Sequence, residues 1–120
     1  MEAIVEQFPR TGQLQLAIQV SANINYSANA ARRMVGRFVA DEIGYMLRTG
    51  EPTLVVGERI CWRVPVLLAF PDSGPVGAVG TVDVNVETGQ ILVTPGQIAE
   101  ITQHANDLAA NYTRTAGPAS

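Results

Sequence analysis

Residues 60–70 read ICWRVPVLLAF, and in this stretch a large apolar side chain occupies every second position. The alternating residues are Ile60, Trp62, Val64, Val66, Leu68 and Phe70. Because successive side chains of a strand point to opposite faces, this spacing predicts a strand that presents one continuous apolar face to a core. Pro65 has no N–H to donate to a ladder, so we expect the strand to be bulged or at a sheet edge there.

The same period continues after a loop at residues 70–75. Apolar side chains stand at Val79, Val82, Val84 and Val86, with Thr81, Asp83, Asn85 and Glu87 facing the other way. Residues 87–90 predict a hairpin turn, because Gly89 can adopt the positive φ that closes a short loop. Residues 91–93 then return as the partner strand. Gly74, Gly77 and Gly80 indicate a flexible loop entering this hairpin rather than a phosphate-binding loop, which would need a lysine that the chain lacks.

The remaining strands and helices are predicted from their own hydrophobic patterns and from capping residues. Residues 13–20 alternate as a half-buried strand, and residues 53–56 predict a short apolar strand. Ser27 or Asn29 can cap a helix over residues 30–48, which Gly50 and Pro52 would end. Thr94, followed by proline and by Gln97, has the pattern of a capping box, and the last helix runs from there to about Tyr112.

This order, strand–helix–four strands–helix, predicts an α+β fold in which an antiparallel sheet of about four to five strands packs against two helices. We expect a single domain over residues 1–112 and a flexible C-terminal tail over residues 113–120.

Composition limits the possible functions. The 120 residues are 47% hydrophobic and carry a formal charge of −3, which argues against a surface devoted to nucleic acid. No apolar run is long enough to span a membrane, the first residues lack the pattern of a secretory signal, and the single cysteine suits a reducing cytoplasm. We therefore expect a cytoplasmic protein that does not bind membranes.

The sequence indicates no catalytic residue, metal site or cofactor. Cys61 and His104 are the only residues of their types, too few for a zinc site, and the strand period turns Cys61 away from the Trp62 face. Residues 83–94 resemble a calcium loop only superficially, because threonine stands at its sixth and twelfth positions. A strand followed by a helix also occurs in ribbon–helix–helix DNA binders, but these have two short helices, so direct binding of nucleic acid is not expected.

The helix predicted over residues 30–48 carries two noteworthy sets of side chains. Small residues recur every four positions at Gly36, Ala40 and Gly44, and Arg33, Arg37 and Arg48 lie beside them. This pattern fits a helix packed tightly on its own sheet with solvated arginines, or a seam with another helix. Glu42 falls on the apolar side, where an unpaired carboxylate is costly. We expect it to pair with an arginine, such as Arg59 or Arg63, or to face a partner.

Three runs also carry a family resemblance. EPTLVVGER (residues 51–59), WRVPV (62–66) and GAVGTVDVNVETGQIL (77–92) resemble small uncharacterised bacterial proteins, some of them antitoxin-like partners of PIN-domain ribonucleases. The last run is also similar to the hairpin of PepSY-type domains. The resemblance covers roughly residues 28–112.

The resemblance implies a non-catalytic protein-binding regulator that masks a partner such as a PIN-domain ribonuclease, at the acidic metal-binding pocket of that enzyme. Guanidinium groups suit this task because they bind carboxylates bidentately. The partner-binding candidates are Arg33, Arg37, Arg48, Arg59, Arg63 and Glu42. The alternative is a self-assembling homo-oligomeric structural module. Its interface would use the exposed side of the first strand (Gln13, Gln15 and Gln19) or the small residues Gly36, Ala40 and Gly44.

Overall fold

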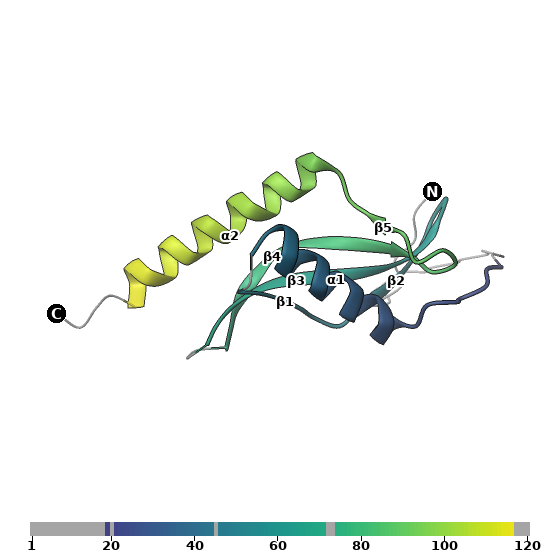
Figure 1. Ribbon diagram of the computed structural model, residues 1–120, viewed down its shortest axis with the longest axis horizontal. Coiled ribbons are helices and arrows are strands. Elements are labelled where there is room, and N and C mark those ends of the chain that lie inside the picture. Colours follow the sequence, from purple (N-terminus) through teal and green to yellow (C-terminus); the bar gives the residue numbers. More distant parts are fainter. Residues whose placement is uncertain (1–18, 20, 45, 72–73, 117–120) are drawn as a thin grey trace, which may run out of the picture.

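A computed structural model describes residue 19 and residues 21–44, 46–71 and 74–116. In these residues an antiparallel sheet of five strands packs against two helices (Figure 1), which confirms the predicted α+β class. The order is α1 (Ala28–Glu42), β1 (Leu47–Thr49), β2 (Thr53–Val56), β3 (Ile60–Phe70), β4 (Gly74–Asn85), β5 (Ile91–Leu92) and α2 (Pro95–Ala116). The strand predicted over residues 13–20 lies outside the described residues, apart from Gln19. The last helix continues past Tyr112 to Ala116.

The long strand β3 is the centre of the sheet. It pairs with β4 on one side and with both β1 and β2 on the other, and β4 pairs in turn with the short strand β5. The predicted face of β3 is confirmed, because Val64, Val66 and Leu68 are buried in one core cluster and Trp62 and Phe70 pack against it.

Pro65 lies opposite an interruption of the neighbouring edge strand. Thr49 at the end of β1 opposes Val66, and Thr53 at the start of β2 opposes Arg63, so residues 50–52 leave the ladder between them. The Gly50 N–H donates to the Pro65 carbonyl oxygen over 2.9 Å. Because no strand residue lies opposite Pro65 on this side, the proline leaves no ladder hydrogen bond unmade. Strand β3 continues through Pro65, and its register with β4 shifts only after Val66 and after Leu68.

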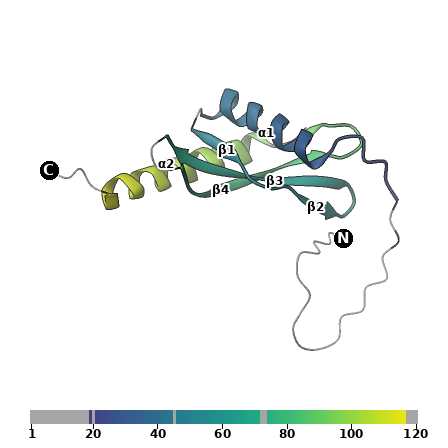
Figure 2. The same ribbon diagram turned by 90° about the horizontal axis from the view of Figure 1, so that it is seen from below.

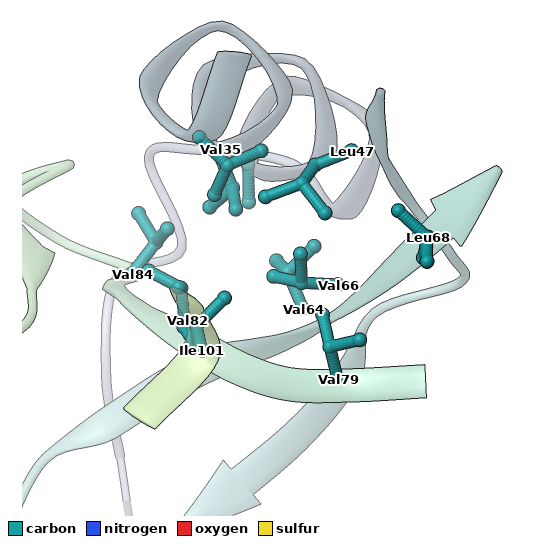
Figure 3. Packing of buried hydrophobic residues seen from close by; sticks show 11 residues of the cluster. Val35, Leu47, Val64, Val66, Leu68, Val79, Val82, Val84 and Ile101 are labelled. Atoms are coloured by element: carbon teal, nitrogen blue, oxygen red, sulfur yellow. The ribbon is translucent and has the colours of Figure 1, made fainter. Parts of the chain in front are cut away.

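Helix α1 and the sheet share one core. Ala31, Val35 and Val39 of α1 are 0% exposed and belong to one buried cluster with side chains of β3 and β4. Figure 3 shows Val35 among these side chains. The view turned by 90° shows α1 lying over one side of the sheet (Figure 2). Each fully buried valine contributes about 1.5–3 kcal/mol relative to an exposed one. This apolar layer therefore fixes where α1 sits.

The predicted C-terminal end of the first helix is wrong. Ser27 caps α1 by accepting from the Ala30 N–H over 3.1 Å, but the helix ends at Glu42 instead of Arg48. Residues 47–49 form β1, where Leu47 is buried opposite Leu68. A ladder with β3 is available to these residues only in the folded chain, and this tertiary pairing overrides the local helical pattern.

The glycine-rich segment is also different from the prediction, because it forms the first half of β4 instead of a loop. The glycines of this segment leave room for helix α2 to pack on the strand. A Cβ atom added at Gly80 would lie 2.7 Å from Cγ1 of Ile101, and one added at Gly77 would lie 3.0 Å from Cδ2 of Leu108. Because Gly77 and Gly80 have no side chains, the helix can approach the backbone of β4 closely at these two positions.

Both predicted turn motifs are confirmed. Gly89 has a φ of +74°, and the Asn85 side chain accepts from the N–H groups of Glu87 and Thr88. At the start of α2, the Thr94 hydroxyl accepts from the Gln97 N–H over 3.1 Å and the Gln97 side chain accepts from the Thr94 N–H over 2.8 Å. The hairpin therefore closes at Gly89, and the capping box fixes the point at which α2 begins.

The contact between Gly80 and α2 predicts a stability change. Gly80→Ala should lower the free energy of unfolding by about 1–3 kcal/mol, because Ile101 must move away from the added methyl group. Gly44→Ala is the matched control, since nothing lies within 4 Å of a Cβ atom there and its φ is not positive. Urea denaturation measures both. Equal stability of the two variants would show that α2 does not pack on β4 in this way.

Candidate functional site

A groove of about 580 Å³ runs along the side of α1 that faces β5. We call it the α1 groove, and its lining residues are Tyr26, Ala30, Arg33, Met34, Arg37, Phe38, Asp41, Glu42 and Ile91. Its apolar floor arises because Met34 and Phe38 lie next to the buried stripe of α1 and remain half-buried. Ile91 of β5 forms the opposite wall. The groove is thus an apolar channel with a charged rim.

The charges on this rim are ordered along the helix. Arg33 and Arg37 come first, and Asp41 and Glu42 follow in the last turn; all four side chains are exposed. The first turn of α1 has no acidic residue and the last turn has no basic residue. The helix dipole disfavours negative charge at the C-terminal end, so Asp41 and Glu42 each cost α1 about 0.3 kcal/mol at such exposure. Exposed residues that break a local rule of this kind are candidates for binding.

The five arginines predicted to bind a partner do not gather at one place. Arg33 and Arg37 lie together on the α1 groove, and Arg48 is exposed on β1, where it also donates to the Leu47 carbonyl. Arg59 is exposed in the turn between β2 and β3. Arg63 lies on the sheet face turned away from the core and binds Asp83 bidentately, with distances of 2.9 and 3.0 Å.

Glu42 is not paired with Arg63, because that guanidinium is occupied by Asp83. The carboxylate of Glu42 is exposed, since α1 ends at this residue, and so the burial that made pairing necessary does not occur. No described arginine lies within ion-pair distance of it. The alternative that Glu42 faces a partner stays a prediction.

The predicted strip of small residues is divided in the structure. Gly36 faces β1, where an added Cβ would lie 3.6 Å from the Thr49 hydroxyl, and that hydroxyl donates to the Arg32 carbonyl. Ala40 is exposed, and Gly44 follows the end of α1. Gln13 and Gln15 lie outside the described residues, whereas Gln19 is exposed. The structure therefore places Gly36 in a contact within the chain.

A second hollow, of about 640 Å³, lies where the β2–β3 turn meets β5 and the start of α2. Cys61, Glu58, Arg59 and Asp83 are among its lining residues. His104 is not among them; its Nδ1 lies 3.1 Å from the Val79 carbonyl oxygen. In the described part of the chain, no three His, Cys, Asp or Glu side chains are placed to hold a metal ion. The hollow therefore does not bring Cys61 and His104 together.

Comparisons of the chain with protein families, with curated proteins and with solved structures found no match. Over the described residues, neither helix is long and apolar enough to cross a membrane. The geometry and charge of the α1 groove are therefore the basis on which we assign a function.

Two ion pairs among the described residues differ in exposure, so we expect different coupling energies when each is measured in a double-mutant cycle with alanine. Arg63 and Asp83 are only 28% and 25% exposed and bind bidentately, so we expect a coupling of about 0.5–1 kcal/mol in unfolding free energy. Arg32 and Glu51 are 42% and 87% exposed, and their coupling should be close to zero. A coupling at Arg63–Asp83 no larger than that of the surface pair would contradict a structural role for it.

Proposed function

We propose that this chain is a non-catalytic protein-binding regulator whose α1 groove binds an acidic surface of a partner protein, such as the metal-binding pocket of a PIN-domain ribonuclease. One observation carries the proposal. Arg33 and Arg37 stand one helical turn apart on the rim of the groove, exposed and without an ion pair to any described residue.

The surroundings of these arginines support this use. Two guanidinium groups on one helix face can bind carboxylates bidentately, and Met34 and Phe38 provide adjacent apolar area. Because α1 is held to the sheet by three fully buried side chains, the arginines project from a rigid element. A surface that is already formed loses little conformational entropy when it binds.

The other three candidate arginines are less suited to bind a partner in the α1 groove. Arg63 would have to give up Asp83 before it could bind a partner, and breaking a half-buried bidentate pair is unfavourable. Arg48 and Arg59 are exposed but do not line the α1 groove. We therefore assign the partner-binding role to Arg33 and Arg37.

Capture followed by an activity assay tests the function. The immobilised chain is exposed to a lysate of its native host, and each captured protein is identified by mass and produced in pure form. We expect a PIN-domain ribonuclease whose RNA cleavage is inhibited by the chain. The double substitution Arg33→Ala, Arg37→Ala should weaken this inhibition at least about tenfold, because it removes both charge-assisted contacts.

Arg32→Ala is the matched control, since Arg32 lies on the same helix but binds Glu51 beyond β1. It should inhibit as well as the wild type. Capture of no ribonuclease, or a captured ribonuclease whose cleavage rate is unchanged by the chain, would overturn the proposed function.

A further inference from the structure

We infer that the α1 groove binds α1 of a second copy of this chain, with the two helices antiparallel about a two-fold axis near Phe38. The charge order of α1 carries this inference. In an antiparallel pair, the basic half of each helix lies against the acidic end of the other. Arg33 and Arg37 of one copy would therefore meet Asp41 and Glu42 of its partner, and the same contacts would form twice.

This pairing also accounts for the unfavourable position of the acidic residues. Asp41 and Glu42 lie at the C-terminal end of their own helix, where the dipole disfavours negative charge. In the antiparallel dimer they lie beside Arg33 and Arg37 of the partner's helix, and these two positive charges favour them. An arrangement that costs stability in one chain is thus compensated when two chains associate.

The apolar part of the groove lies between these charges. Met34 and Phe38 are half-buried in the single chain, and Ile91 forms the facing wall. Packing the same residues of a second copy against them would remove more apolar surface from water. The contact area is that of one helix and its flank, which suits an association of micromolar affinity.

The dimer would cover the arginines to which we assign partner binding. A second copy and an acidic partner would then compete for the same groove, so that a captured partner would separate the dimer. Only this competition rests on the proposed function; self-association does not.

Two variants of opposite charge test the inference by sedimentation equilibrium. The acidic variant carries Arg33→Glu and Arg37→Glu, and the basic variant carries Asp41→Arg and Glu42→Arg. Each should raise the dimer dissociation constant by at least about tenfold, because like charges then face one another. An equimolar mixture of the two should associate as a heterodimer, because acidic side chains of one helix then face arginines of the other at the substituted positions.

All four substituted side chains are exposed, so both variants should fold, which circular dichroism checks. Arg32→Glu is the control outside the α1 groove: it reverses one arginine charge where the acidic variant reverses two, and it should leave the dimer intact. A wild type that stays monomeric at high micromolar concentration would overturn the inference. So would a dimer that both variants preserve, or a mixture that does not associate. None of these results alters whether a ribonuclease is captured, so the proposed function is judged separately.

Discussion

The structure depends on one dry layer between α1 and the β3–β4 hairpin. Val35 and Val39 of the helix meet Val64, Val66, Val82 and Val84 of the sheet, and none of these side chains is more than 1% exposed. Valine is stiff and branched at Cβ, so it fits the pleated surface and loses little side-chain freedom on burial. This layer holds α1 in place, and with it the charged rim of the α1 groove.

The two helices are held in different ways. Helix α1 buries three residues completely, whereas Ile101 is the one residue of α2 that belongs to the buried cluster among those described. Helix α2 approaches instead through the glycines of β4, beyond the short pairing of β4 with β5. Helix α1 is therefore the better support for a binding surface.

Local patterns were sufficient to predict much of the fold. The two-residue period of β3, the positive φ of Gly89 and the reciprocal cap of Thr94 and Gln97 each depend on neighbours close in sequence. The end of α1 and the strand at Gly74–Gly80 could not be predicted in this way. The first depends on a ladder with Leu68 across the fold, and the second on the approach of Ile101 and Leu108.

The candidate site was predictable only in part, for the same reason. The four-residue spacing of Arg33 and Arg37 places them on one helix face whichever fold forms around them. The role of Arg63 depends on Asp83, which lies opposite it on the neighbouring strand. The sequence does not specify the register of the two strands, so this ion pair could not be predicted. The exposure of Glu42 likewise depends on where α1 ends.

Amide hydrogen exchange under native conditions tests most directly whether α1 is a rigid part of this core. If the valine layer joins helix and sheet into one unit, the amides of Val35 and Val39 should exchange with the same opening free energy as those of Val64 and Val82. Exchange of the α1 amides at a much lower opening free energy, while the sheet stays protected, would contradict the account.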